Sequence, residues 1–232
     1  MLKYGMVKFN VIIPAAGSGS RMGAETPKQY ILLLGKPLIE HTLAVFCACL
    51  RINRITVVLS PDDAFCAGEI VSNPKIQIRY CGGDTRAASV LNGLLAMRSD
   101  TEADDWILVH DAARPCLSAA LLEHLLTTQE SDAVGGLLPI PVADTLNRAD
   151  PSQHVARTES RDNLWLAQTP QMFRYRLLTN ALKAANGAPT DEAQAVEALG
   201  LKPKLVLGDS ANLKVTYPQD LLLAQAILQG TN

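Results

Sequence analysis

The sequence predicts an α/β fold built on a mostly parallel sheet, because short apolar runs alternate with helical patterns along the chain. The runs that we interpret as buried strands lie at residues 11–14, 55–59, 76–80, 106–110 and 133–139. Such alternation places helices on both faces of the sheet, and ligands of these sheets bind beyond the carboxyl ends of the strands. The functional loops are therefore expected to follow strands.

Helices are predicted between and after these strands. From Ile39, apolar residues follow at intervals of four, three and four, which puts one helical face at Leu43, Phe46 and Leu50. A second helix is predicted after Asp84, behind an Asp or Thr cap, with apolar residues at positions 90, 91, 94 and 95. Later in the chain we expect helices at 191–199 and 218–228, and short strands at 205–207 and 213–215.

Residues 141–160 interrupt the alternation and are predicted to form a β-hairpin arm. They read PVADTLNRADPSQHVARTES, with a turn at residues 149–152 and moderate strand propensity on each side. A mobile surface loop is the alternative, but about 20 structureless residues would be unusual inside a compact domain. No linker rich in Gly, Ser or Pro divides the chain, so residues 1–232 are expected to form a single domain that carries this arm.

The composition argues against several classes of protein. With 21 Lys and Arg against 23 Asp and Glu, the net charge of −2 gives no broad positive surface for nucleic acid or for an anionic membrane. The five cysteines are odd in number and contain no CxxC pair, so neither a disulfide framework nor a structural zinc site is indicated. The amino-terminal segment resembles neither a signal peptide nor a membrane span, and a cytoplasmic location is expected.

A glycine-rich loop follows the first predicted strand and indicates a phosphate site. The strand runs into AAGSG at residues 15–19, where backbone N–H groups at the sheet edge can surround phosphate oxygens. The spacing fits neither the dinucleotide pattern GxGxxG nor the P-loop pattern GxxxxGK[ST]. Two cations follow, Arg21 and Lys28, and together with the loop they suit a polyphosphate. A plain strand-to-helix turn is the alternative for the loop taken alone.

A second cluster, LVHDAARP at residues 108–115, places Asp111 at the same sheet edge. A carboxylate that faces bound phosphates usually requires a cation between them, so Asp111 is a candidate Mg²⁺ ligand, with a helix N-cap as the alternative. Arg114 is a candidate for holding a second phosphate, with a salt bridge to a neighbouring acid as the alternative. We interpret His110 as a structural residue, because a phosphate nucleophile is already ionised at pH 7 and needs no base.

An ordered set of motifs carries a resemblance to a known family. The motifs are PAAGSGSRM, PKQY, GGDTRAASVLNGL, LVHDAARP, LWLAQTPQMF, TDEA and NLKVTYPQDL. Together they closely resemble the 2-C-methyl-D-erythritol 4-phosphate cytidylyltransferases, the CTP-using enzymes of the non-mevalonate isoprenoid pathway. The resemblance runs from about residue 11 to residue 228. It implies a Rossmann-like nucleotidyltransferase core and a β-arm that clasps a second subunit into a homodimer.

The resemblance assigns roles to individual residues on the nucleotide side of the site. The implied CTP-binding residues are Ala15, Ala16, Gly17, Gly19, Gly83, Asp84, Ser89, Asp111 and Ala112. The first four would form the phosphate cradle, and the segment 83–89 would recognise cytosine and ribose. Arg21, Lys28 and Lys214 are implied as catalytic cations at the phosphates, and Asp111 as the Mg²⁺ ligand.

On the acceptor side, the resemblance implies a second set of contacts. The residues that would hold methylerythritol phosphate are Arg114, Thr145, Arg161, Thr169 and Thr190. Thr145 and Arg161 are expected to reach over from the arm of the second subunit.

Ordinary alternatives exist for three of these acceptor residues. Thr190 can serve as a helix N-cap, Thr169 can shape the turn before a proline, and Arg161 can pair with a neighbouring acid. One departure from the family pattern is Ala211, where members can carry an acid; metal binding would then rest more heavily on Asp111.

The reaction implied is attack by a phosphate oxygen of methylerythritol phosphate on the α-phosphorus of CTP, which expels pyrophosphate with the help of Mg²⁺. The nearest alternative is a cytidylyltransferase that acts on another polyol phosphate, such as ribitol 5-phosphate. An oxidoreductase on a dinucleotide fold is disfavoured by the displaced glycine and by the Lys28 segment. A non-catalytic nucleotide-binding module is disfavoured because all four of Arg21, Lys28, Asp111 and Lys214 are present.

Overall fold

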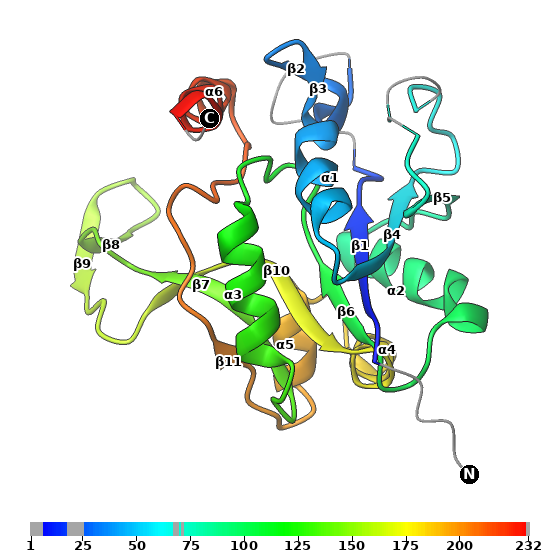
Figure 1. The fold of residues 1–232 in the computed structure, drawn as a ribbon. Coiled ribbons are helices and arrows are strands. Elements are labelled where there is room, and N and C mark those ends of the chain that lie inside the picture. Colours follow the sequence, from blue (N-terminus) through cyan, green and yellow to red (C-terminus); the bar gives the residue numbers. More distant parts are fainter. Residues whose placement is uncertain (1–6, 18–25, 67–69, 71, 231–232) are drawn as a thin grey trace.

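A sheet of seven strands forms the centre of the molecule (Figure 1). The computed structural model describes residues 7–17, 26–66, 70 and 72–230. The strands of this sheet are β1 (Phe9–Pro14), β4 (Ile52–Leu59), β5 (Ile76–Tyr80), β6 (Trp106–Val109), β7 (Gly135–Pro141), β10 (Trp165–Arg174) and β11 (Lys204–Leu205). They lie in the order β11-β7-β10-β6-β1-β4-β5, and β10 is antiparallel to both neighbours while the other pairs are parallel. The prediction of a mostly parallel α/β sheet is confirmed.

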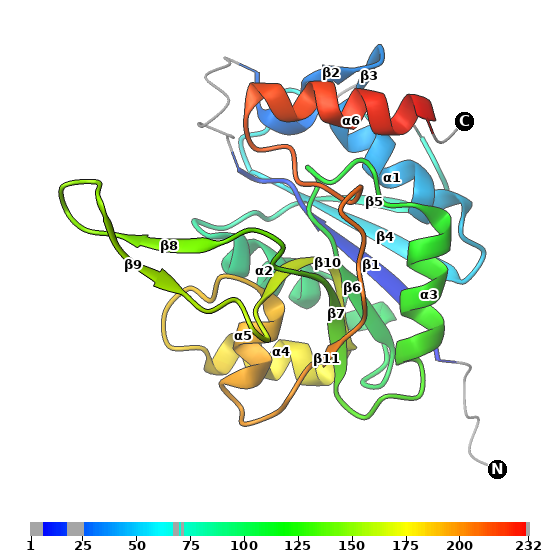
Figure 2. The ribbon, with the colours of Figure 1, turned by 90° about the vertical axis from the view of Figure 1, so that its left-hand side faces the viewer.

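Helices cover both faces of this sheet (Figures 1 and 2). They are α1 (Leu38–Ala48), α2 (Arg86–Ala96), α3 (Ala119–Gln129), α4 (Tyr175–Ala184) and α5 (Glu192–Glu197). A further helix, α6 (Pro218–Gly230), and short 3-10 turns at Lys28–Tyr30 and Arg98–Asp100 complete the helical elements that the structure describes. Within the described residues, none of these helices combines the length and the apolar character that a membrane span requires.

Alternating residues of the strands build one apolar core on each face. Along β1, Val11 and Ile13 belong to the buried cluster that contains apolar residues of α1 and α3. Ile12, between them, belongs to the cluster that contains apolar residues of α2, α4 and α5. Because both faces are covered, central strands such as Trp106–Val109 are buried along their whole length and consist of apolar residues.

The topology creates a switch point between two neighbouring strands. From β1 the chain moves to β4 and β5 on one side, and it then crosses back to β6 on the other side of β1. In open α/β sheets, ligands bind outside the carboxyl ends of the strands where the order reverses in this way. The loops that follow Pro14 and Val109 meet at this point.

The structure confirms most of the predicted elements. The five predicted strands correspond to β1, β4, β5, β6 and β7, and the strand expected at 205–207 begins slightly earlier, as Lys204–Leu205. The predicted helices correspond to α1, α2, α5 and α6. The Thr85 side chain caps α2 by accepting the Ala88 N–H, as one of the two proposed caps required.

Two local predictions are wrong. The helix α1 ends at Ala48, because Cys49 adopts an extended conformation (φ −72°, ψ 117°), and Leu50 is 95% exposed instead of lying on the buried helical face. Residues 213–215 do not form a strand. The Val215 N–H donates to the Ala113 carbonyl at 2.8 Å, but the segment does not continue into a ladder.

The hairpin predicted at 141–160 is confirmed. It consists of β8 (Leu146–Ala149) and β9 (Val155–Glu159), which pair in antiparallel fashion. In its turn, the Asp150 carboxylate accepts the backbone N–H groups of Ser152 and His154. Figure 2 shows the arm projecting away from the body that contains the sheet.

The helix α6 lies across the carboxyl end of the sheet, beside a small hairpin made of β2 (Leu32–Leu33) and β3 (Lys36–Pro37) (Figures 1 and 2). Ala224 of α6 and Val215 are both fully buried in a third apolar cluster, which also contains Leu33. The burial of Val215 anchors the irregular segment before α6. This anchoring fixes the position of the neighbouring Lys214 at the sheet edge.

Candidate active site

The loops after β1 and β6 line a cavity of about 580 Å³ at the carboxyl edge of the sheet. Many of the residues predicted to bind a nucleotide line it together: Ala15, Ala16, Gly17, Lys28, Gly83, Asp84, Ser89, Asp111, Ala112 and Lys214. They come from segments that are far apart in the sequence, so their convergence is a product of the fold. The remaining two residues of that set, Gly19 and Arg21, lie outside the described residues.

The loop after β1 is held in place by both of its backbone groups at Ala15. The Ala15 N–H donates to the Val58 carbonyl at 2.8 Å, and the Ala15 carbonyl accepts the Gln29 side-chain amide at 2.8 Å. The Ala15 N–H is therefore committed to the sheet, and a phosphate cradle has to be built from the amides that follow it. Gln29 is buried and precedes the buried Tyr30, so the segment that presents Lys28 is packed against this loop.

The segment 83–89 is shaped by a serine hydroxyl. Ser89 accepts the Gly83 N–H at 3.0 Å through Oγ, and the same hydroxyl lies within 3.0 Å of the Thr85 carbonyl. A side chain at Gly83 would collide with Ala88, whose Cβ would lie 2.7 Å from the added atom. The loop is therefore folded tightly onto the first turn of α2, with its backbone at the cavity.

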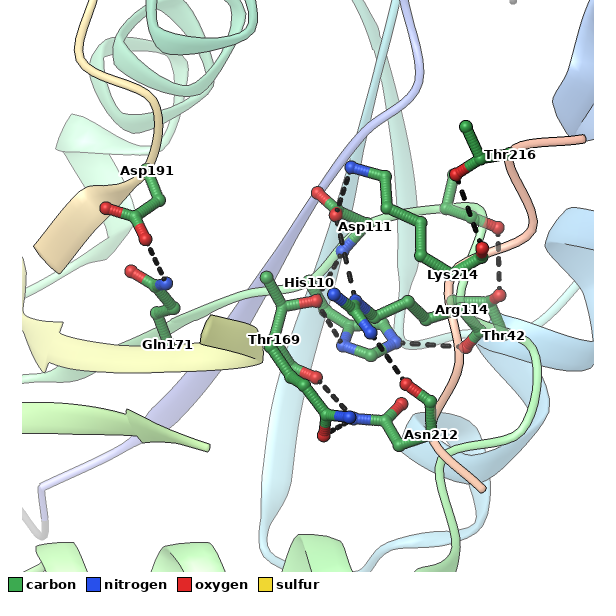
Figure 3. A network of polar contacts seen from close by, with 12 residues as sticks. Thr42, His110, Asp111, Arg114, Thr169, Gln171, Asp191, Asn212, Lys214 and Thr216 are labelled. Carbon is green, nitrogen blue, oxygen red and sulfur yellow. Dashed lines mark hydrogen bonds and ion pairs between the residues drawn. The ribbon is translucent and has the colours of Figure 1, made fainter. Parts of the chain in front are cut away.

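A cluster of charges surrounds the Asp111 carboxylate at the centre of the cavity wall. The Lys214 Nζ lies 2.7 Å from Oδ2, and the Arg86 Nε lies 2.9 Å from Oδ1. Arg114 Nε is farther away, at 3.9 Å from Oδ2. Figure 3 shows the Lys214 amino group directed at Asp111, with Arg114 on the opposite side of the carboxylate.

These neighbours decide the charge of the buried carboxylate. Burial alone would raise the pKa of Asp111, but the charges of Arg86 and Lys214 outweigh burial and hold the pKa well below its ordinary value. Burial would likewise lower the pKa of Arg86, and the charges of Glu192 and Asp111 raise it instead. Asp111 is therefore an anion and Arg86 a cation at neutral pH.

His110 braces the loop from behind, as the interpretation of it as a structural residue requires. The imidazole is fully buried, with Nε2 3.1 Å from the Arg114 carbonyl and Nδ1 3.0 Å from the Thr169 hydroxyl (Figure 3). Since a carbonyl can only accept, Nε2 carries the proton, and Nδ1 accepts from Thr169. The same hydroxyl accepts the Asp111 N–H at 3.0 Å, so a neutral His110 positions both Asp111 and Thr169.

We expect this histidine to make stability dependent on pH. Burial lowers the pKa of His110 to about 4. Between pH 6.5 and 4, His110 is therefore protonated in the unfolded chain and neutral in the folded protein. The contribution to stability is fully present above pH 6.5, and about 3 kcal/mol is lost as the pH falls through this window, at about 1.4 kcal/mol for each unit. Urea unfolding between pH 7.5 and 4.5 should show a steeper loss in the wild type than in His110→Gln.

The matched control for this experiment is His154→Gln, because His154 is exposed on the arm. That variant should follow the pH profile of the wild type. Equal slopes for the wild type and His110→Gln would contradict the assignment of a buried neutral imidazole.

Arg114 carries a feature that indicates a ligand. Its Nη1 donates to the Asn212 carbonyl at 2.6 Å, and its guanidinium is mostly buried. Its Nε is buried without a hydrogen-bond partner in the part of the chain that is described. An unsatisfied buried donor on a cation is costly, so this group is suited to an anionic ligand placed beside Asp111.

The other predicted acceptor residues divide into two groups. Thr169 lies beside Asp111, as described above, and Thr190 directly precedes Asp191, which caps α5. The alternative for Thr190, that it is the N-cap itself, is wrong, since the Asp191 side chain accepts the Gln194 N–H. Thr145 and Arg161 are exposed at the base of the arm. None of the five predicted acceptor residues is among those that line the cavity.

Two charged residues of the site were not predicted from the sequence. Arg86 lines the cavity and pairs with Glu192, which is 0% exposed at the start of α5. Both residues lie inside motifs that carry the family resemblance, GGDTRAASVLNGL and TDEA. A signal existed in the second motif, because the buried face of the short helix that follows Asp191 contains an acidic residue, which requires a partner.

An open α/β sheet that gathers a tight backbone loop, two lysines and one ionised carboxylate at its switch point is suited to a nucleoside polyphosphate. Such a sheet and site define the class of α/β proteins that bind nucleotides at the carboxyl ends of their strands.

Comparison with known proteins identifies the family. The family described as "IspD: 2-C-methyl-D-erythritol 4-phosphate cytidylyltransferase" matches residues 9–230. The 2-C-methyl-D-erythritol 4-phosphate cytidylyltransferase of Nitrosospira multiformis is 58% identical over 230 residues, covering 97% of this chain and 99% of the relative. The enzyme of the same name from Dechloromonas aromatica is 59% identical over 229 residues, with 97% of this chain and 99% of the relative covered.

Solved structures agree with these relatives. A crystal structure of a 4-diphosphocytidyl-2C-methyl-D-erythritol synthase is 40% identical, with a TM-score of 0.86 and coverage of 96% of this chain and 99% of the other. The 2-C-methyl-D-erythritol 4-phosphate cytidylyltransferase of Thermus thermophilus is 32% identical, with a TM-score of 0.77 and coverage of 96% and 100%. The chain belongs to the 2-C-methyl-D-erythritol 4-phosphate cytidylyltransferase family, and it is a cytidylyltransferase enzyme.

Proposed function

We propose that the protein transfers CMP from CTP to 2-C-methyl-D-erythritol 4-phosphate, forming 4-diphosphocytidyl-2-C-methyl-D-erythritol and pyrophosphate in a Mg²⁺-dependent reaction. The observation that carries the proposal is the convergence of the predicted nucleotide residues on one cavity, in a chain 58% identical to a relative named for this activity. The reaction would supply an intermediate of isoprenoid precursor biosynthesis.

CTP would occupy the cavity with its phosphates at the loop after β1. The amides after Ala15, together with Arg21 and Lys28, would bind the triphosphate, while the backbone of Gly83 and Asp84 would read the cytosine edge. Cytosine must be selected by hydrogen bonds to the base, because a phosphate cradle is indifferent to it. The tight fold of the 83–89 loop around Ser89 supports this assignment, since it places the loop backbone at the cavity.

The residues present fit a magnesium ion. Mg²⁺ is usually held by one or two carboxylates together with substrate phosphates, and Asp111 offers one ionised carboxylate at the cavity wall. Within the described residues, no group of three or more His, Cys, Asp or Glu side chains forms a dedicated metal cage. When bound, the ion would supply positive charge that neutralises the phosphate oxygens.

The side chains of the chain would then act by charge and by position. The attacking acceptor phosphate and the triphosphate of CTP are both anions and repel each other. Arg21, Lys28 and Lys214 would lower this repulsion and stabilise the charge that moves toward the leaving pyrophosphate. No covalent intermediate and no general base are required, because the attacking phosphate oxygen is already ionised at pH 7. Holding the two substrates for in-line attack can contribute roughly 7 to 11 kcal/mol in favourable cases.

The acceptor would lie on the side of Asp111 where Arg114, Thr169 and Thr190 are found. The unpartnered Nε of Arg114 supports a phosphate contact there. Thr169 donates its hydroxyl proton to His110, so toward the acceptor this hydroxyl would act as a hydrogen-bond acceptor. A hydroxyl of the sugar alcohol satisfies that requirement better than a phosphate oxygen.

The arm would complete the acceptor site of a second subunit in a homodimer. The apolar side chains at and beside the arm that remain exposed in one chain are Val155 (65%), Leu164 (44%), Trp165 (40%) and Leu166 (52%). Such a surface is typical of a protein–protein interface. Thr145 and Arg161 lie in the same region and are exposed, which leaves both side chains accessible to a second subunit.

Co-expression of two inactive variants tests this sharing of the site. An Arg161→Ala chain and a Lys214→Ala chain should each be defective at low acceptor concentration. Heterodimers of the two would contain one intact site, so the mixture should recover roughly a quarter of wild-type activity. Activity no higher than that of either variant alone would contradict a site shared between subunits.

Pyrophosphate release tests the proposed function directly. Purified protein would receive CTP, Mg²⁺ and methylerythritol phosphate, with parallel samples containing ribitol 5-phosphate or no acceptor. We expect release only with methylerythritol phosphate. Release only with ribitol phosphate would support cytidylyl transfer but would show that the acceptor is a different polyol phosphate. No pyrophosphate release in any sample would overturn the proposal.

A further inference from the structure

We propose that Arg86 is a positioning residue, whose guanidinium joins the segment 83–89, the Asp111 carboxylate and the segment 190–192 at the start of α5 into one unit through Asp111 and Glu192. The inference rests on the function proposed above. It concerns a residue pair to which neither the sequence motifs nor the family resemblance gave a role.

The guanidinium uses all three of its nitrogens in this arrangement. Nε donates to Asp111 Oδ1 at 2.9 Å, Nη1 donates to Glu192 Oε1 at 2.7 Å, and Nη2 donates to Glu192 Oε2 at 3.1 Å. The contact with Glu192 is bidentate, which fixes direction as well as distance. A lysine has one charged nitrogen and cannot reproduce this fork.

Glu192 is a fully buried carboxylate, and Arg86 is its ion-pair partner among the described residues. Burial raises the pKa of Glu192, and the charge of Arg86 opposes that rise. A buried ion pair of this kind gives little net stability compared with apolar residues, so stability alone does not explain its presence. Its position between two substrate loops suggests geometry as the reason.

On the acceptor side, the pair holds the start of α5, and Thr190 lies two residues before Glu192. The Thr190 N–H donates to the Gln194 side chain at 2.7 Å, and the start of α5 is tied to β10 by Gln171, which donates to Asp191 and accepts the Ala193 N–H. Figure 3 shows the contact between Gln171 and Asp191. Arg86 adds a direct link from α5 to Asp111, because it donates to both Glu192 and Asp111.

On the nucleotide side, Arg86 is the first residue of α2, directly after the Thr85 cap and the segment that would read cytosine. It occupies Asp111 Oδ1, whereas Oδ2 faces Lys214. The side-chain rotation of Asp111 is thereby fixed, with Oδ2 presented toward the lysine. A misplacement of about 1 Å between reacting groups can cost about 100-fold in rate, so a single residue that sets both sides has a large effect on the transfer step.

The experiment compares Arg86→Gln, Arg86→Lys, Glu192→Gln and the double variant Arg86→Gln/Glu192→Gln. Steady-state pyrophosphate release gives kcat and the KM for each substrate, and calorimetry gives CTP affinity without turnover. We expect Arg86→Gln and Arg86→Lys to lose about 10- to 100-fold in kcat/KM for the acceptor, and to lose CTP affinity by a smaller factor, because Lys28 and the loop after β1 would still hold the nucleotide. Glu192→Gln should shift the same constants in the same direction.

The double variant separates positioning from two independent losses. If Glu192 acts through Arg86, the double variant should be no worse in acceptor kcat/KM than Arg86→Gln alone. Arg174→Gln is the matched control, because Arg174 stacks on Trp106 at the amino end of β6, with its Cζ 3.6 Å from the ring centroid. It should lower the unfolding temperature while leaving both KM values unchanged.

If the wild type turns over CTP and methylerythritol phosphate normally, two results would overturn the inference and leave the proposed function standing. One is wild-type kinetic constants in Arg86→Gln. The other is a uniform fall in activity that matches the loss of folded protein, without a change in the KM for the acceptor. Absence of turnover by the wild type with methylerythritol phosphate would overturn the proposed function, and the inference with it.

Discussion

Replacing Lys214 by alanine is expected to lower kcat by about 100- to 1,000-fold, the range found when one preorganised charge or donor is removed from a transition state. Its Nζ lies 2.7 Å from Asp111 at the cavity, where charge would build up on the phosphates. Lys28→Ala should have an effect of the same size, because Lys28 lines the cavity from the opposite loop. The measurement is kcat at saturating CTP and acceptor.

Lys36→Ala is the control for both variants, since Lys36 is exposed on β3 and does not line this cavity. It should retain the wild-type kcat. Circular dichroism and the unfolding temperature establish that each variant is folded. Near-normal turnover in both Lys28→Ala and Lys214→Ala would refute the assignment of these lysines to the reacting phosphates.

Asp111→Asn is expected to reduce kcat/KM for CTP by at least about 100-fold and to raise the Mg²⁺ concentration needed for half-maximal rate. The asparagine keeps the shape of the side chain and removes the charge, so Arg86, Arg114 and Lys214 would face one another without their carboxylate. Breaking a buried ion pair on one side costs about 3 to 5 kcal/mol, and the unfolding temperature should therefore fall as well.

Asp209→Asn is the control for this variant. Asp209 is exposed two residues before Ala211, and its carboxylate accepts the Ala211 N–H. If the metal depends on Asp111, Asp209→Asn should leave the Mg²⁺ dependence unchanged. A larger change in the Mg²⁺ dependence for Asp209→Asn than for Asp111→Asn would show that our proposal assigns the metal to the wrong acid.

The parallel half of the fold could be predicted because its strands are buried on both faces. Runs such as residues 106–109 are apolar throughout, and helical spacing lies between them. The antiparallel strand β10 could not be found in this way. Its first three residues are exposed, its later residues are buried and include Gln168, Thr169 and Gln171, and Pro170 interrupts it. Neither an alternating nor a continuous apolar pattern survives in that sequence.

The end of α1 and the strand at 213–215 were predicted wrongly. Leu50 continues the apolar spacing of α1, but the helix ends at Ala48, and nothing in the spacing reports the extended conformation of Cys49. The segment 213–215 contains two strand-forming residues, and its neighbours in space are a loop and α6, which offer no ladder to join.

The site was predictable where its residues lie in short motifs after strands, as with the 15–19 loop and Asp111. The pairing of Arg86 with Glu192 was not, because it joins residues 106 positions apart, and such partners emerge only when α2 and α5 are folded onto the same face. The hydrogen bonds of the Thr169 hydroxyl with His110 and Asp111 could not be predicted for the same reason, since the partners are 59 and 58 positions apart.

One strand links the outer arm to the reacting groups. β10 begins at the exposed Trp165, reaches Thr169 four residues later, or about 13 Å along an extended chain, and continues into the sheet beside β6. Between these two residues the pairing with β7 is irregular, and Thr169 is also held by its contacts with His110 and Asp111. A second subunit that packs on the exposed Trp165, as proposed above, would contact the same strand that carries Thr169, so we expect loss of that contact to raise the KM for the acceptor.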